Sequence, residues 1–410
     1  MRRRPSPFSP LRELTAFNGK RALSYRSIAV TMVVGVMVLW FAAGRDGADA
    51  AGRAIGTDFV SFWTASQVAL ADGGAAAYDI GRHGLAQRTA FGPGDGYVAF
   101  FYPPIFLMLC LPMALLPYLA ALALWLGSTA VAYVIMVRRW LGGSFGSAAL
   151  TLAAFPPTLL NAGHGQNAFL TAALFGGGLL AMRTRPWLAG LLLGLLVMKP
   201  HLAILLPLAL ACRGEWRTFV ATGVAATGWC VLSWVVLGTG AWEGFVASTG
   251  LARSTLEDGL VSPAKMVSMF AAMRVLSLDV ATAYAAQAAF AAVGAAAVIY
   301  AARARLPRPA QDAILAAATL TVSPFLLDYD LTLMAIPLAW WFAQTQQRGF
   351  QPYEKAALLA LFIAPLFLRT LATAASLPLA PLVTGGLLLG CWRAALTTSP
   401  SHHSRAASAR

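Results

Sequence analysis

A few polar side chains stand inside an otherwise apolar chain, and their types suit contact with hydroxyl and phosphate groups. Asp58 lies between apolar and aromatic residues in the stretch GTDFVSFW. Lys199 interrupts the apolar segment 187–211, too far from either end for its side chain to reach the membrane surface easily. A cation at a break between two helices suits an anionic headgroup such as a phosphodiester. His201, next to the same break, is a second candidate contact.

Two interpretations of Asp58 are open. It stands where the N-cap of a following helix would stand, and a carboxylate accepts hydrogen bonds from the first free N–H groups of a helix. Serine, threonine or asparagine would cap as well, so capping alone does not require an aspartate. The other interpretation is a functional carboxylate beside a membrane span, where polar groups are costly and usually serve function.

Three further groups of residues are candidates for substrate contact, each with a structural alternative. Tyr102 precedes two prolines that suit the first turn of a helix. The stretch GHGQN is either a plain turn or a source of hydrogen-bond donors for a sugar or phosphate. The pair of carboxylates around Tyr329 either caps the next helix or binds hydroxyls or a metal. The candidate side chains in the last two groups are His164, Gln166, Asn167, Asp328 and Asp330.

Well-known soluble cofactor motifs are missing from the sequence. It has no glycine-rich dinucleotide or Walker motif, no HExxH and no CxxC, so soluble nucleotide chemistry and a zinc site are unsupported. The four cysteines lie in or beside apolar runs without paired spacing, which favours a role as small apolar fillers.

The elements that must position these residues are membrane helices. The chain has 410 residues, of which 59% are hydrophobic and only 11% charged. Apolar runs recur that approach the ~20 residues needed to cross the hydrocarbon core, and they predict an all-α polytopic membrane protein with about 12 transmembrane helices. Runs such as PWLAGLLLGLLV do not alternate, which excludes a β-barrel. The net charge of +14 comes largely from arginines in short loops and termini, as the positive-inside rule expects, and not from a nucleic-acid site.

The predicted organisation has three parts. Residues 1–27 form a basic cytoplasmic tail, residues 28–393 a membrane domain, and residues 394–410 a disordered cytoplasmic tail. The first span, 28–44, is interpreted as an uncleaved signal anchor. The long stretch 45–101 then becomes the first extracytoplasmic loop.

That loop contains the expected interfacial helix. DFVSFWTASQVALAD carries apolar residues at helical intervals, and Phe59, Phe62 and Trp63 are expected to anchor it in the interface, with the aromatic face against lipid or protein. If the arginine-rich connections are cytoplasmic, then the Asp58 loop, GHGQN, the Lys199 break and LDYD at 327–330 all face outward.

Two segments have unusual shapes. Segment 102–137 forms either two short spans or one span and a re-entrant piece. The lysine–proline pair inside 187–211 predicts two short helices that meet at a tip. A second polar loop is expected over 238–279, with KMVSMFAAMRVL as an interfacial helix.

The order and spacing of several motifs resemble the family 87 glycosyltransferases, within the wider GT-C class of membrane glycosyltransferases. The resemblance covers about residues 55–345. It rests on GTDFVSFWTASQVAL followed by AAAYD, then FYPPIFLMLCLPMALLPYLAALALW, GHGQNAFLTAALF, RPWLAGLLLGLLVMKPHLAILLPLAL and SPFLLDYDLTLMAIPLAWW.

This resemblance implies a GT-C-like bundle and a transferase reaction. Such enzymes move a sugar from a polyprenyl-phosphate carrier to an acceptor hydroxyl on the extracytoplasmic face, here the outer face of the inner (plasma) membrane. Asp58 matches the essential carboxylate of the first outer loop and would be the general base. Lys199 matches the family's lysine and would offset the charge of the leaving phosphate. Aromatic residues such as Trp63 would hold the lipid carrier, and direct displacement implies inversion. The resemblance also implies that no metal and no cofactor is needed.

One departure concerns the sugar. The mannosyltransferase branch carries histidines after its SP…D stretch, in a pattern like SPxSWDHH, whereas this chain has Tyr329 and Asp330 there. A hexose is therefore expected, with mannose open. Two other functions also remain open: a transporter or flippase of a lipid-linked or polar solute, and a structural assembly partner. A transporter usually shows internal repeats, which the sequence does not.

Overall fold

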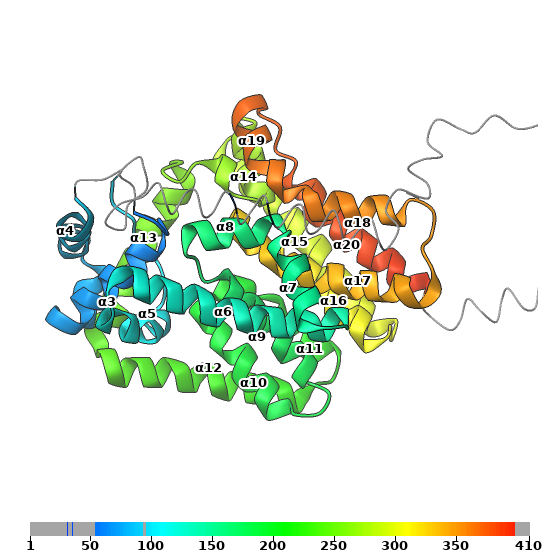
Figure 1. The fold of residues 1–410 in the computed structure, drawn as a ribbon, viewed down its shortest axis with the longest axis horizontal. Coiled ribbons are helices and arrows are strands. Elements are labelled where there is room, and N and C mark those ends of the chain that lie inside the picture. Colours follow the sequence, from blue (N-terminus) through cyan, green and yellow to red (C-terminus); the bar gives the residue numbers. More distant parts are fainter. Residues whose placement is uncertain (1–30, 32–34, 36–53, 93–95, 398–410) are drawn as a thin grey trace, which may run out of the picture.

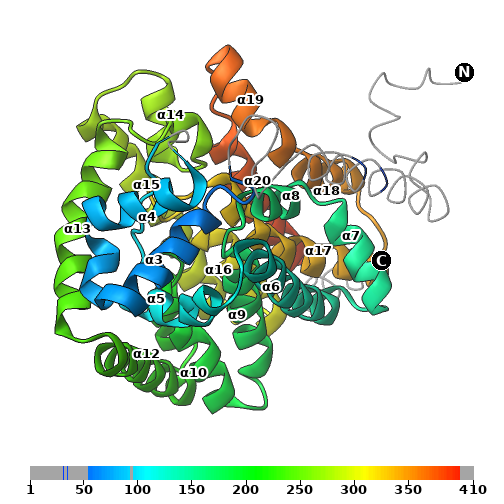
Figure 2. The same ribbon diagram turned by 60° about the vertical axis from the view of Figure 1, so that its left-hand side comes forward.

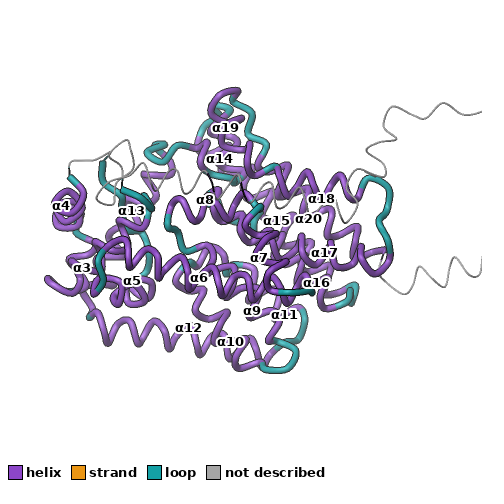
Figure 3. The backbone as a smooth tube through the Cα atoms, in the orientation of Figure 1, coloured by secondary structure: helices purple, strands orange, loops and turns teal. Residues whose placement is uncertain are grey.

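The computed structural model describes residues 31, 35, 54–92 and 96–397, and within them the regular structure is helical, with one isolated bridge between Met266 and Leu327 (Figures 1 and 3). The α-helices are α3 (Phe59–Asp72), α4 (Ile80–Phe91), α5 (Pro104–Cys110), α6 (Tyr118–Leu141), α7 (Phe145–Ala153), α8 (Pro156–His164), α9 (Ala168–Ala181), α10 (Pro186–Gly194), α11 (Leu205–Cys212), α12 (Trp216–Leu237), α13 (Thr239–Glu257), α14 (Met269–Val275), α15 (Val280–Arg303), α16 (Arg308–Thr319), α17 (Ala335–Arg348), α18 (Glu354–Ile363), α19 (Pro365–Ala375) and α20 (Ala380–Thr397). The 3₁₀ turns are η1 (Gly74–Tyr78), η2 (Leu111–Leu115), η3 (Leu195–Met198), η4 (Pro200–Leu202), η5 (Pro263–Lys265) and η6 (Asp328–Met334).

The helical membrane class is confirmed, but the number of long spans is smaller than predicted. Three described helices, α6, α12 and α15, are long and apolar enough to cross a membrane, and a fourth span results if α18 and α19, bent by 63°, count as one. The structure therefore does not support the predicted count of about 12 spans. The reason is that prolines and glycines divide most apolar runs into shorter helices. The predicted first span, 28–44, and the tail 1–27 lie outside the described residues, apart from positions 31 and 35.

The predicted break at Lys199 is confirmed. Lys199 has a non-helical backbone conformation, with φ −141° and ψ 69°, between η3 and η4. Pro200 requires this, because its ring disfavours the helical conformation in the preceding residue. The apolar run 187–211 is thus two short pieces, α10 with η3 and η4 with α11.

Segment 102–137 holds the short pair α5 and η2 followed by the long span α6, which fits the predicted alternative of one span and a shorter piece. Two other segments differ from their predicted form. The expected polar loop over 238–279 is mostly helix, because α13 occupies 239–257. Helix α20 continues to Thr397, beyond the expected start of the tail at 394.

Helix α3 forms as predicted, and two residues of its aromatic face are buried in the protein. Phe59 and Phe62 are 0% and 1% exposed. They pack in an aromatic cluster with Phe106 of α5 and Tyr118 and Trp125 of α6. Of the two predicted surroundings, lipid or protein, Phe59 and Phe62 meet protein, because the residues after 100 supply an aromatic surface on which α3 is buried.

The centre of the molecule is α16, whose residues from Ala310 to Thr319 are all buried. It packs against α11, α15, α17 and α20, and Figure 2 shows it among these helices, behind α3 and α5. The arginine-rich connections meet at one end of these helices. Arg213 lies 2.6 Å from Asp312, and Arg308 lies 2.9 Å from Glu215.

Candidate active site

The carboxylate of Asp58 lies at the start of α3 but does not cap that helix. Asp58 occupies the N-cap position without a side-chain cap hydrogen bond. Its Oδ2 accepts a hydrogen bond of 3.0 Å from Nε2 of Gln166, and its side chain is 28% exposed. The carboxylate is therefore held from outside its own helix and remains open on one side, as a group that meets a substrate must.

The GHGQN stretch is a turn, and it also carries site residues. Its glycine, Gly165, ends α8 with a left-handed φ of 65°. A Cβ there would lie 2.6 Å from Cβ of Phe59, so only glycine lets the turn approach α3 this closely. The backbone N–H of Asp58 donates to the carbonyl of His164 at 3.0 Å. Nδ1 of His164 lies 2.8 Å from Oγ1 of Thr57 and 3.8 Å from Oδ1 of Asp58.

Gln166 orients the carboxylate because its own amide is fixed by two donors. The hydroxyl of Tyr102 and the backbone N–H of Asn167 each donate to Oε1 of Gln166 at 3.0 Å. The amide nitrogen is thereby directed toward Asp58. Tyr102 stands just before the proline-led start of α5, so its predicted structural place is confirmed and its side chain also joins the site.

Lys199 forms a buried ion pair directly behind this group. Its Nζ donates to Oδ1 of Asp330 and, at 3.2 Å, to Oδ1 of Asn167. It also lies 5.0 Å from the ring centre of Tyr329. The Lys199 and Asp330 side chains are 4% and 1% exposed. From the sequence, Lys199 is expected to face a phosphate. In the structure, its ammonium group is already paired with the carboxylate of Asp330.

The two aspartates around Tyr329 have different surroundings. Asp330 both pairs with Lys199 and accepts from the backbone N–H of Leu327 at 3.2 Å, so it also caps η6. Asp328 accepts from the N–H of Tyr329 at 2.9 Å through Oδ1, whereas its buried Oδ2 has no hydrogen-bond partner in the described part of the chain. Nη1 of Arg369 lies 3.9 Å from that Oδ2.

Arg369 is the residue that the sequence interpretation missed. It lies in α19, within the apolar stretch PLFLRTLATAA, and its side chain is 42% exposed. The signal was present in the sequence, because a charge inside an apolar segment marks a candidate site.

Two predicted residues stand apart from the hydrogen-bonded group. His201 follows the Lys199 break, but its buried Nε2 has no partner among the described residues. The indole of Trp63 donates to the carbonyl of Leu116 at 3.1 Å and packs against Phe91 and Tyr118, away from Asp58.

The connected residues thus form one site with two depths. Asp58, His164, Gln166 and Tyr102 make the partly open layer, and Asn167 joins it to the buried Lys199–Asp330 pair. An open carboxylate over a neutral ion pair suits proton abstraction from a hydroxyl. Among the described residues, no group of three or more His, Cys, Asp or Glu side chains could hold a metal ion.

Helix α4 supports α3 through a buried histidine. His83 is 0% exposed, and its Nε2 lies 2.8 Å from Oγ1 of Thr64, 3.1 Å from the carbonyl of Ser61 and 3.2 Å from the amide nitrogen of Gln87. Burial lowers the pKa of His83 to about 4, so the ring is neutral at pH 7. Its Nδ1 lies 3.1 Å from the hydroxyl of Tyr97, whose pKa burial raises to about 12.

Comparison with known proteins adds one match. A family model described as glycosyltransferase family 87 matches residues 100–324. The matched range contains Tyr102, the GHGQN turn and Lys199, begins after Asp58 and ends just before Asp328. No curated protein and no solved structure matches the chain.

Proposed function

Because the chain belongs to glycosyltransferase family 87, we propose that it is a membrane enzyme that moves a hexose from a polyprenyl-phosphate carrier to a hydroxyl of a lipid or glycan acceptor. The reaction inverts the anomeric carbon and takes place on the extracytoplasmic face of the inner (plasma) membrane. Asp58 is the general base. The sugar is a hexose, mannose or a similar one. Family membership supports an enzyme over the transporter or assembly partner that the sequence left open.

The observation that carries this proposal is the state of the Asp58 carboxylate. It lies at a helix start without capping the helix, and the amide of Gln166 holds it while part of it stays exposed. An acceptor hydroxyl within hydrogen-bond distance of its free side would give up its proton to this carboxylate.

The proposed step needs one base and one stabilised leaving group. The acceptor oxygen forms a bond to the anomeric carbon while the bond from that carbon to the phosphate oxygen breaks. The electron pair of the broken bond remains on the phosphate, and the acceptor proton moves to Asp58. A phosphate leaves without being protonated, so a second carboxylic acid, as in a glycosidase, is unnecessary.

The buried pair would shape the donor side of the site. Lys199 donates to Oδ1 of Asn167, and Nδ2 of the same amide is buried with no partner among the described residues. Lys199 therefore fixes a buried amide whose N–H groups have no partner in the described chain and would suit an oxygen of the sugar donor. We assign Lys199, Asn167 and Asp330 to donor binding on this basis, with His201 beside them and Trp63 farther out, against the carrier.

Substitution of Asp58 tests the proposal. The purified protein is given a panel of polyprenyl-phosphate sugars and acceptor lipids, and transfer is compared for wild type and Asp58→Asn. A general base contributes roughly 10²–10⁴-fold to rate, so we expect kcat to fall by at least about 100-fold. Asp72→Asn is the matched control, because Asp72 ends the same helix, is 50% exposed and lies 3.8 Å from Arg82.

The outcomes separate the alternatives. Full transfer by Asp58→Asn would show that another group takes the proton. If no sugar is transferred by wild type but solute uptake into vesicles depends on the protein, the transporter interpretation is correct instead.

A further inference from the structure

The charged side chain of Arg369 lies in an apolar segment, where ordinary contact with water does not explain a charge. The residue lies in the middle of α19, between Leu368 and Thr370, in a helix that with α18 forms one bent apolar pair. Charged side chains in such segments are costly and usually serve a pathway or a ligand. The position of Arg369 in the fold indicates which kind of ligand it could bind.

Helix α19 borders the Asp58 site. It packs against α8, which ends at His164, and against η6, which begins at Asp328. The guanidinium lies 3.9 Å from Oδ2 of Asp328, beyond ordinary hydrogen-bond distance, and that oxygen has no hydrogen bond in the described chain. Arg369 is thus a half-exposed cation at the edge of the site whose hydrogen-bond donors are not used by the described partner.

Lys199 cannot fill the same role as it stands. Its ammonium is buried and engaged by Asp330 and Asn167, so a phosphate could reach it only by breaking that pair. Removing one partner of a buried pair is strongly unfavourable. Arg369 is exposed, and its planar fork of donors matches the oxygens of a phosphate.

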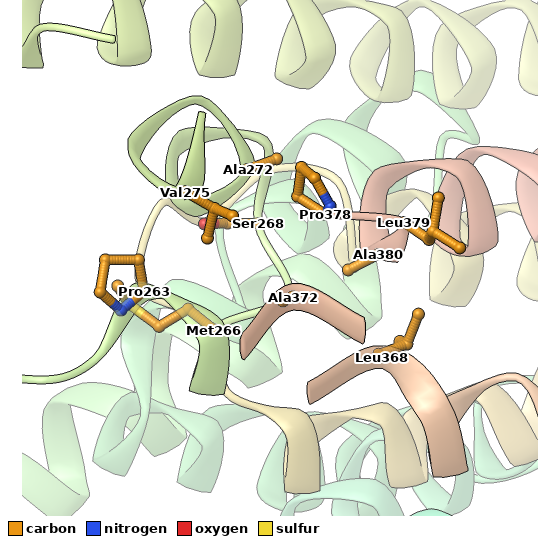
Figure 4. A pocket seen from close by; sticks show the side chains of 10 residues that line it. All are labelled: Pro263, Met266, Ser268, Ala272, Val275, Leu368, Ala372, Pro378, Leu379 and Ala380. Atoms are coloured by element: carbon orange, nitrogen blue, oxygen red, sulfur yellow. The ribbon is translucent and has the colours of Figure 1, made fainter. Parts of the chain in front are cut away.

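An apolar crevice begins beside this cation (Figure 4). Leu368 and Ala372 of α19 form one wall, and Met266, Ala272 and Pro378 are among the residues opposite. The hydroxyl of Ser268, a polar group in the lining, already accepts from the N–H of Ala271 at 3.1 Å and caps α14. The crevice therefore offers contact for hydrocarbon and little for a polar ligand.

The crevice and the site are connected through backbone contacts near Leu327. Met266 is bridged to Leu327, and the N–H of Val267 donates to the carbonyl of Leu326 at 2.8 Å. Asp328 follows directly in sequence. The backbone that carries Met266 and Val267 on the crevice side is thus paired with the backbone just before Asp328, the carboxylate nearest to Arg369.

We propose that Arg369 binds the phosphate of the lipid carrier and that the hydrocarbon next to that phosphate contacts the apolar residues at the mouth of the crevice between α14, α19 and the start of α20. This rests on the proposed function and assigns one side of its donor site. An amphipathic ligand with one anionic group matches a cation next to an apolar wall. When the sugar leaves, the phosphodiester becomes a monoester with more negative charge, so the same contact strengthens as the bond breaks.

Binding of two matched lipids tests the assignment. A polyprenyl phosphate and the uncharged polyprenol of equal chain length are titrated against the purified full chain, with intrinsic fluorescence as the readout. Arg369→Gln should weaken binding of the phosphate by about tenfold or more, since hydrogen bonds to charged groups are the strong ones, and leave the polyprenol unchanged. Arg369→Lys should lie between the two. Ala372→Trp, which fills the crevice, should weaken both lipids.

Arg253→Gln is the matched control, because Arg253 is a 74% exposed arginine on α13 whose recorded partner is Glu257, four residues on. If Arg369→Gln binds the phosphate as wild type does while sugar transfer persists, this inference fails and the proposed function survives. If wild type neither binds polyprenyl phosphate nor transfers sugar from it, the proposed function fails. If Arg369→Gln unfolds, the Arg369→Lys variant is measured instead. An unchanged phosphate affinity of Arg369→Lys would also overturn the assignment.

Discussion

At the scale of single residues, the candidate site shows how burial changes the role of a charge. Sequence alone treats Lys199 and Asp330 as two separate polar features of outward-facing tips. In the fold they neutralise each other at 4% and 1% exposure, while Asp58 stays partly open. Which charge is free and which is matched depends on contacts between residues 131 positions apart, and no local pattern encodes that.

The buried pair leads to a prediction about stability. Lys199→Met and Asp330→Asn should each lower the free energy of unfolding by about 3–5 kcal/mol, because each leaves an unmatched charge out of water. The double variant removes both charges and should be more stable than the sum of the two losses implies. The measurement compares the unfolding temperatures in detergent of the wild type, the two single variants and the double variant, as a double-mutant cycle. Additive losses would show that the two side chains do not act as a pair.

At the scale of elements, turns and helix starts position the site. Gly165 lets the turn between α8 and α9 touch α3, and the prolines before α5 place Tyr102 against Gln166. The sequence predicted α3, the helix start after Tyr102 and the break at Lys199, because proline and glycine act locally. It did not predict the burial of Phe59 and Phe62, since the surface that covers them comes from α5 and α6.

Helix α4 gives a prediction about pH. Its His83 has a folded-state pKa of about 4, below the ordinary value of 6.5, so the unfolded chain binds more protons between these values. Stability is therefore full above about pH 6.5 and is lost as pH falls toward 4, by up to ~1.4 kcal/mol per pH unit. The ring faces the polar side chains of Thr64, Gln87 and Tyr97.

The measurement compares unfolding temperatures of wild type and His83→Gln from pH 7.5 to 4.5. Wild type should lose more stability than the variant on acidification, since glutamine does not titrate. Parallel curves would mean that His83 takes up its proton without cost in the folded protein. Arg82→Gln, an exposed change on the same helix, serves as the control.

At the scale of the whole molecule, the sequence indicates a helical membrane protein of the right family but overstates its long spans. Hydropathy counts apolar residues and does not see that 168–181 or 186–198 form helices too short to cross alone. Two of the arginine-bearing connections, by contrast, do lie together in the fold. Arg213 and Arg308 meet through Asp312 and Glu215 at one end of the helices.

The two ends of helix α12 lie far apart, and this gives a prediction about the orientation of the protein. Helix α12 begins at Trp216, close to the arginine-rich end, and runs 22 residues, roughly 33 Å, to Leu237. At Leu237 it touches Gly74, where an added Cβ would lie 2.7 Å from the Leu237 carbonyl oxygen. The loop that carries Asp58 and Asp72 is therefore attached at the end of α12 opposite Cys212, which is exposed. If the arginines are cytoplasmic, a membrane-impermeant thiol reagent should label Cys212 only in inside-out vesicles. In a Cys212→Ser background it should label Asp72→Cys only in right-side-out vesicles, whereas labelling of both positions from one side would contradict the proposed orientation of the active site.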